Sequence, residues 1–179
     1  ENGILTLDTC DKEARFIRWC DAFNVPVIFL VDTPGFSSDA EQEQSMNGLM
    51  RTVPKPVFAI CESTVPKITV HIGRCFGVAR LVMGSLRMGV DFAYSWPSAQ
   101  VARINPAEAV ETIYREEISS SKEPDRVRKE KLAELLKDYI NYPFHAAEQA
   151  ILTDCGLTRD TRPTLSLALI ALSNKKPRP

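Results

Sequence analysis

The chain has 179 residues, of which 44% are apolar and 25% are charged, and its formal net charge is -1. This length suits one domain with enough chain to bury a real core. A net charge so close to zero gives no reason to expect a nucleic acid or an anionic membrane as a partner. No apolar run reaches the roughly 18–20 residues that a membrane-spanning helix needs. The bulk properties are typical of a soluble globular domain.

The five cysteines are odd in number and form no CxxC pair. This pattern argues against a disulfide framework and against a zinc site, so no metal is expected. It favours a reducing compartment, which predicts a cytoplasmic protein, or one of the mitochondrial matrix if the source is eukaryotic. Because free cysteine is usually buried, we expect these thiols to be inert core residues. They are Cys10, Cys20, Cys61, Cys75 and Cys155.

Helix and strand patterns alternate along the first part of the chain. Residues 11–23 carry apolar side chains at the spacing of one helical face. Residues 25–31 are a near-continuous apolar run, which is typical of a strand covered on both sides. Residues 41–62 favour helix, although Pro54 and Pro56 must interrupt it.

The same alternation continues to the end of the chain. Residues 68–72 predict a second buried strand, and residues 77–88 predict a helix with Val78 and Leu81 facing inward. Strands separated by helices predict an α/β fold with mostly parallel pairing, in one domain that spans residues 1–179. The remaining expected elements are strands at 92–95 and 100–104, helices at 106–117, 129–140 and 161–173, and a solvated tail at 175–179.

Two loops, one after Val31 and one after Ile72, would meet at the same edge of a parallel sheet, where α/β proteins often bind ligands. Pro34 and Gly35 shape a turn in the first loop. In the second loop, Gly77 permits close backbone approach, and the following helix offers unpaired amide N–H groups. Such amides suit a developing oxyanion, which indicates enolate-type chemistry on a thioester or ureido carbonyl. By spacing alone, a glycine before a helix is more often an ordinary turn.

Other candidate groups carry a weaker signal. The sequence holds neither a GxSxG nucleophile motif nor a P-loop lysine motif. Arg74 and Arg80 flank the glycine turn and could attract a carboxylate or phosphate, although surface or ion-pair arginines are the default interpretation. Two histidines and two glutamates are expected to be structural or solvated rather than catalytic. They are His71, His145, Glu41 and Glu43.

Six stretches together carry a resemblance to a known family. At these residues the chain resembles the carboxyltransferase subunits of biotin-dependent acyl-CoA carboxylases, such as the propionyl-CoA carboxylase beta subunit, transcarboxylase and related decarboxylases. The resemblance runs through nearly the whole chain and is to the carboxy-terminal, crotonase-like half of these subunits. The stretches are residues 3–6, 14–24, 31–36, 62–67, 94–98 and 160–162.

The resemblance implies a crotonase-like spiral of ββα units that holds carboxybiotin, which a biotin carboxyl carrier protein or domain would deliver. A separate acyl-CoA-binding half or subunit would face it across a homo- or hetero-oligomer. It further implies that two backbone amides, at Gly77 and Val78, stabilise the biotin enolate as CO₂ leaves. The other biotin contacts that it implies are Pro34, Gly35, Phe36, Phe76 and Ala79.

Several positions depart from the family pattern. Val78 replaces the second glycine of the amide pair, and its branched side chain would crowd the pocket. Leu81 falls at a substrate-tuning position, and Asn105 and Glu108 replace two further glycines. These departures support an alternative, a catalytically weakened relative that acts as a scaffold or interaction subunit. A third hypothesis is a crotonase-like enzyme that uses CoA thioesters without biotin. The sequence leaves open the acyl-CoA and the choice between carboxylation, decarboxylation and transfer.

Overall fold

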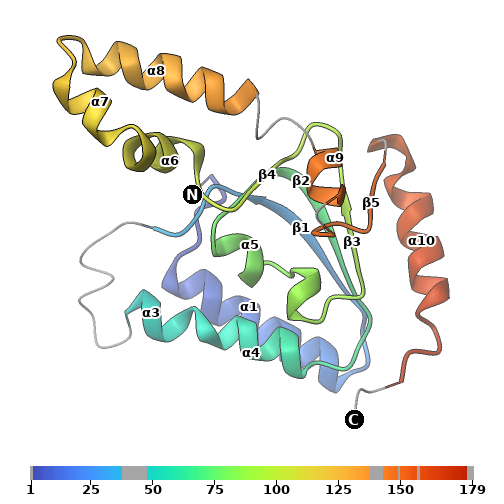
Figure 1. Ribbon diagram of the computed structural model, residues 1–179. Coiled ribbons are helices and arrows are strands. Elements are labelled where there is room, and N and C mark those ends of the chain that lie inside the picture. The colour runs from blue at the N-terminus through green and yellow to red at the C-terminus, as the bar shows by residue number, and fades with distance from the viewer. Residues whose placement is uncertain (1, 38–47, 138–142, 149, 157, 177–179) are drawn as a thin grey trace.

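A computed structural model describes residues 2–37, 48–137, 143–148, 150–156 and 158–176 (Figure 1). Its centre is a sheet in which every strand pair is parallel, with the order β1-β2-β3-β5, and β4 pairs with β2. The predicted α/β fold with parallel pairing is therefore confirmed. The strands are β1 (Val27–Thr33), β2 (Lys67–Phe76), β3 (Phe92–Ser95), β4 (Gln100–Ala102) and β5 (Asp154–Cys155).

Strand β1 is buried on one face only. Val27, Phe29 and Val31 are buried, whereas Ile28 is 40% and Leu30 57% exposed. The buried residues pack in the main apolar core, which includes residues of α1 (Leu7–Ala22) and α4 (Pro54–Glu62). The expectation that this strand is covered on both sides was therefore wrong, because α1 and α4 lie on the same face of the sheet (Figure 1).

Strand β2 continues four residues beyond the predicted end at Ile72, to Phe76. Its first half pairs with β1 and β3, and its second half pairs with β4, with Arg74 opposite Gln100. The chain thus leaves the sheet after Phe76, so the loop predicted directly after Ile72 was misplaced. Near this change of partner the β1–β2 register shifts between Val31 and Thr33.

The first helix starts earlier than its apolar spacing predicts. Thr6 caps it, because its Oγ1 accepts the amide N–H of Thr9 at 3.4 Å while the Thr9 hydroxyl accepts the amide N–H of Thr6 at 2.6 Å. Pro54 begins α4 after the short helix α3 (Leu49–Thr52), so the predicted break is confirmed there. Pro56 lies within the first turn of α4 and does not interrupt it, because the first-turn amides need no acceptor within the helix. Residues 41–47 of the predicted helix lie outside the described residues.

The helix predicted over residues 77–88 is interrupted. The structure has one short helix, α5 (Ala79–Val82), and a 3₁₀ turn, η1 (Leu86–Met88). Gly84 separates them with φ +86°, and a Cβ there would lie 2.8 Å from the Phe29 ring and from the Thr69 hydroxyl. Val78 is 57% exposed, so the expectation that it faces inward was wrong.

The second half of the chain adds mainly helices. The helices α6 (Pro106–Ile113), α7 (Arg115–Ser120) and α8 (Pro124–Leu135) project from the body as an arm (Figure 1). The predicted 106–117 helix divides at Tyr114, and α8 begins at Pro124 rather than at residue 129. The remaining helices are α9 (Pro143–Glu148), η3 (Thr158–Asp160) and α10 (Thr161–Ala171). Among the described residues, no helix is both long enough and apolar enough to cross a bilayer.

Two lysines are buried or nearly buried, and one of them contradicts the prediction of a solvated tail. Lys67, 2% exposed, donates from Nζ to the carbonyl oxygens of Ile60 and Ser63 at 2.5 and 2.7 Å, at the end of α4. Lys175 was expected in a solvated tail, but its Nζ contacts Val65 O and Asp91 Oδ2, both at 2.8 Å. These contacts anchor the segment after α10 to the residues just before β2 and β3, so the prediction of a solvated residue was wrong.

The cysteine predictions hold for three of the five thiols. Cys10, Cys20 and Cys75 are buried, Cys155 is partly buried, and Cys61 is exposed on α4. The expectation of a core position was therefore wrong for Cys61, because α4 presents only Pro56, Ala59 and Ile60 as buried residues.

Candidate functional site

A cavity of about 420 Å³ lies where β1 and β2 end. The N-terminal segment, the loop after β1, α5 and the start of α6 gather around this point (Figure 1). This is the sheet edge at which the sequence predicted a site. The cavity is lined by Ile4, Pro34, Gly35, Phe36, Ser37, Phe76, Gly77, Val78, Ala79, Asn105 and Glu108.

The turn after β1 is fixed by short-range hydrogen bonds. The amide of Gly35 donates to Thr33 Oγ1 at 3.2 Å, and the Leu5 amide donates to the Gly35 carbonyl oxygen at 3.0 Å. The Ser37 amide closes this small bridge with a 2.8 Å bond to the Leu5 carbonyl oxygen. Pro34, Gly35 and Phe36 are thus held as one wall of the cavity, which brings three of the predicted contacts together.

Gly77 provides the sharp turn between β2 and α5. Its φ is +59°, in the left-handed region, and the nearest atom to an added Cβ would be the Arg103 carbonyl oxygen at 3.9 Å. Its amide N–H donates to the Ala102 carbonyl oxygen at 3.2 Å. The resemblance implied that this amide serves a ligand, whereas in this structure it has a protein acceptor. Gly77 therefore contributes the backbone shape of the site.

The amide of Val78 is the better placed donor. Within the part of the chain that the structure describes, no acceptor is found for this N–H, because Val78 stands at the N-cap position of α5. Its exposed isopropyl group lines the cavity without closing it. Since α5 is a single turn, its helix dipole adds little here. The N–H dipole of Val78 is therefore the main group that can stabilise negative charge at this point.

Of the remaining predicted site residues, two line the cavity and one does not. Phe76, 5% exposed, and Ala79, fully buried, form the back of the cavity. Phe76 also packs against Leu135 and Leu136, so the arm that ends with α8 supports this wall. Leu81, the predicted substrate-tuning position, is partly buried and is not among the residues that line the cavity.

Two polar residues belong to the site although the sequence analysis identified them only as replacements of family glycines. Asn105 caps α6, with its Oδ1 accepting the Ala107 amide at 3.0 Å, and Glu108 lies in the first turn of that helix. Both line the cavity. The signal for this was present, because Asn-Pro followed by an acidic residue is a helix start, and a helix start after a parallel strand points to the same sheet edge.

The flanking arginines have different environments. Arg74 pairs with Asp32, with Nε 2.9 Å from Oδ1, and this hydrogen bond holds the pKa of the Asp32 carboxyl below its usual value. The default interpretation of Arg74 as an ion-pair residue is thereby confirmed. Arg80 is 9% exposed, and its pKa is lowered by burial and by the nearby Arg87 and Arg103. Neither arginine lines the cavity.

The other acid–base candidates do not reach this cavity. His71 is 2% exposed within β2, and burial lowers its pKa to about 4, so the ring is neutral at pH 7. This supports the structural role that the sequence predicted for it. Glu41, Glu43 and the side chain of His145 lie outside the described residues. Within the described ranges, no group of three or more His, Cys, Asp or Glu side chains could hold a metal ion.

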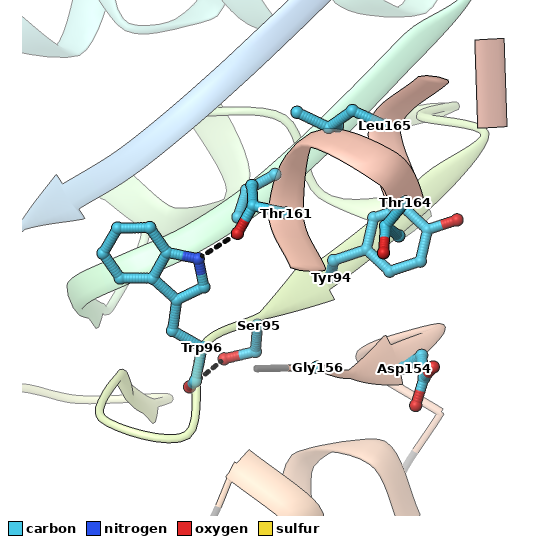
Figure 2. A pocket seen from close by; sticks show the side chains of 9 residues that line it. Tyr94, Ser95, Trp96, Asp154, Gly156, Thr161, Thr164 and Leu165 are labelled. Carbon is cyan, nitrogen blue, oxygen red and sulfur yellow. Dashed lines mark hydrogen bonds between the residues drawn. The ribbon is translucent and has the colours of Figure 1, made fainter. Parts of the chain in front are cut away.

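A second, smaller cavity of about 30 Å³ separates β3 from α10 (Figure 2). Trp96 Nε1 donates to Thr161 Oγ1 at 2.9 Å, which ties the turn after β3 to the first residue of α10. The Ser95 hydroxyl donates to the Trp96 carbonyl oxygen at 3.1 Å. A space of this size suits ordered water rather than a substrate, so the Trp96–Thr161 contact is a structural one.

Comparison with known proteins agrees with the geometry. The family model described as carboxyl transferase domain matches residues 1–179, and the chain belongs to this family. The chain is 39% identical over 173 residues to the putative propionyl-CoA carboxylase beta chain of Bacillus subtilis (strain 168), which covers 97% of this chain and 34% of that protein. It is 37% identical over 175 residues to the methylmalonyl-CoA carboxyltransferase 12S subunit of Propionibacterium freudenreichii subsp. shermanii, covering 98% and 33%.

A solved structure supports the same assignment. The transcarboxylase 12S structure, described as a hexamer with methylmalonyl-coenzyme A and methylmalonic acid bound, superposes with a TM-score of 0.86 at 36% identity. The match covers 98% of this chain and 34% of that chain. The predicted family and its crotonase-like fold are therefore confirmed. The chain spans about a third of the length of the curated relatives that it matches.

Proposed function

We propose that this chain is the biotin side of a carboxyltransferase, which moves a carboxyl group between carboxybiotin and an acyl-CoA. Family membership supports this reaction class. The observation that carries the proposal is the cavity at the ends of β1 and β2, where the Val78 amide has no acceptor among the described residues. An exposed donor of this kind stabilises an oxygen that gains negative charge during a reaction.

The residues of the cavity fit a flat, mostly apolar heterocycle with a polar edge. Its volume of about 420 Å³ lies within the usual range for small-molecule sites, about 300–1,000 Å³. Bound biotin would supply a ureido ring that carries the carboxyl group on nitrogen and gains negative charge on oxygen when that group leaves. Phe36 and Phe76 give apolar walls for such a ring, and Val78 gives the amide donor for its oxygen.

The cavity has one amide site, so the proposed reaction requires partner subunits or domains. One amide site stabilises one developing anion, so the acyl-CoA needs a second site, which we place on a separate half or subunit. A carrier protein or domain would bring biotin to the cavity. The relative of known structure is described as a hexamer. The exposed apolar residues Ile28 and Leu30 of β1 favour assembly of this chain too. Residues 1–179 would then form one structural unit of a larger assembly, and its unpaired thiols favour a reducing compartment such as the cytoplasm.

The proposal is tested by the rate at which free carboxybiotin loses CO₂ in the presence of the chain. The wild-type chain should accelerate this loss over the buffer rate, because the Val78 amide stabilises the charge that appears on the ureido oxygen. Gly77→Val should abolish the acceleration by distorting the turn that presents this amide, whereas Gly156→Ala, a glycine with no atom within 4 Å of an added Cβ, should retain it. A folded wild-type chain without acceleration would favour the scaffold alternative.

A further inference from the structure

Among the described residues that line the cavity, Glu108 is the one with a charged side chain. It is exposed and lies in the first turn of α6, where the Asn105 cap and Pro106 fix the start of the helix. The helix also buries Ala109 and Val110, and it packs against α7 and α8. Glu108 therefore stands at a capped helix start, and among the described residues its carboxylate forms no ion pair.

The cavity thus offers complementary polar groups, among them a donor and an acceptor. The Val78 amide is a donor, and an ionised Glu108 carboxylate is a pure acceptor. Asn105 also lines the cavity; its Oδ1 accepts the Ala107 amide, and its Nδ2 is a further donor. A donor together with an acceptor matches a ligand edge on which a carbonyl oxygen and an N–H group are neighbours. Cyclic ureas and lactams present such an edge.

We propose that Glu108 is a specificity-determining residue that accepts the ring N–H beside the carbonyl of a cyclic urea in this cavity. The proposal rests on the biotin-side function put forward above and deepens it. Glu108 therefore makes this cavity prefer a ring that keeps this N–H to a ring in which the nitrogen is blocked.

This preference concerns binding alone, so it can be measured without any carboxyl transfer. A hydrogen bond to a charged acceptor is stronger than one between neutral groups, although exposure of Glu108 weakens it. We expect a modest effect, about three- to tenfold in affinity. It should depend on the ligand N–H and on the Glu108 carboxylate together, which a double-mutant cycle measures.

The experiment titrates the full 179-residue chain with biotin and with biotin methylated on both ring nitrogens, and follows binding by isothermal calorimetry or ligand-observed NMR. Glu108→Ala should weaken biotin binding three- to tenfold, Glu108→Gln should weaken it less, and neither should change binding of the dimethylated ligand. Glu116→Gln, an exposed change on α7 outside the cavity, is the matched control and should bind biotin as the wild type does. Thermal unfolding checks that each variant is folded.

The outcomes separate the two levels of the proposal. If the wild type binds biotin but Glu108→Ala binds it equally well, the assignment of Glu108 is overturned while the biotin-side function stands. If Glu108→Ala weakens both ligands equally, the residue does not recognise the N–H and the assignment is again overturned. If the wild-type chain binds neither ligand at millimolar concentration, the proposed function itself fails.

Discussion

The amide N–H of Gly77 donates to the carbonyl oxygen of Ala102 across a distance of 3.2 Å. This bond closes the end of the β2–β4 pair, so it fixes where the chain turns out of the sheet. The next amide, that of Val78, is thereby presented at the cavity. Gly77 thus shapes the turn, and the next amide is the donor in the proposed site, with which a valine at position 78 is compatible.

Replacing Gly77 tests the value of its left-handed backbone. Gly77→Ala meets no close atom, since the nearest is 3.9 Å away, so its cost is conformational: about 1 kcal/mol at φ +59°. Gly156→Ala is the matched control, because an added Cβ there has no neighbour within 4 Å. Urea unfolding should show the loss only for Gly77→Ala. Equal stability of the two variants would contradict the strained-turn interpretation.

Lys67 and Lys55 offer a paired test of buried and exposed ammonium groups. Lys67→Met removes the donor to Ile60 O, Ser63 O and Ser63 Oγ, leaving buried acceptors unsatisfied, and should cost about 3 kcal/mol. Lys55→Met breaks an exposed pair with Asp11 and should cost less than about 1 kcal/mol. Denaturant unfolding measures both. A similar cost for the two variants would show that the Lys67 contacts do not hold α4 to β2.

His71 should make the folded state sensitive to acid. Burial lowers its pKa to about 4 in the folded protein, below the ordinary value of 6.5, so the unfolded chain binds the proton more readily. The free energy of unfolding should therefore fall as the pH drops from about 6.5 to 4, by as much as about 3 kcal/mol from this group. His71→Leu should flatten the fall. A variant whose stability declines as steeply as the wild type would remove His71 as the cause.

Glu13 should act with the opposite sign. Its Oε1 is buried without a hydrogen-bond partner among the described residues, and burial raises the pKa of this carboxyl to about 8. The folded state therefore holds the proton more tightly than the unfolded chain, and stability is lost as the pH rises from about 4.5 to about 8. Glu13→Gln should raise the free energy of unfolding at pH 8 and leave it nearly unchanged at pH 4. Unfolding curves at the two pH values decide this, with Glu116→Gln as the control.

The local chemistry of the sequence predicted most of the fold. Pro54 interrupts a helix and Pro106 begins one, as expected, and the apolar strands pair in parallel. The failures have tertiary causes. The extension of β2 to Phe76 depends on pairing with β4, and the break at Gly84 depends on contact with Phe29 and Thr69. Neither partner is near in sequence, so periodicity could not show these features.

The site was predictable in outline but not in detail. Pro34, Gly35, Phe36, Phe76, Gly77, Val78 and Ala79 were all expected at one sheet edge, and all line one cavity. The acceptor for the Gly77 amide lies 25 residues further on, at Ala102, so only the folded chain shows which amide is free. From the sequence, Glu108 was identified only as a position where the family pattern has glycine. Its place in the cavity depends on where α6 begins, which the sequence pattern alone did not show.

The most direct test of the central claim is a titration of the ¹⁵N-labelled chain with biotin, followed by the amide resonances of residues 76–79. The Val78 amide proton should shift downfield in proportion to bound ligand, because it gains an acceptor, whereas the Gly77 amide should move little because it keeps its bond to Ala102. Saturating biotin that leaves Val78 unmoved, or that shifts amides only away from this cavity, would contradict the account.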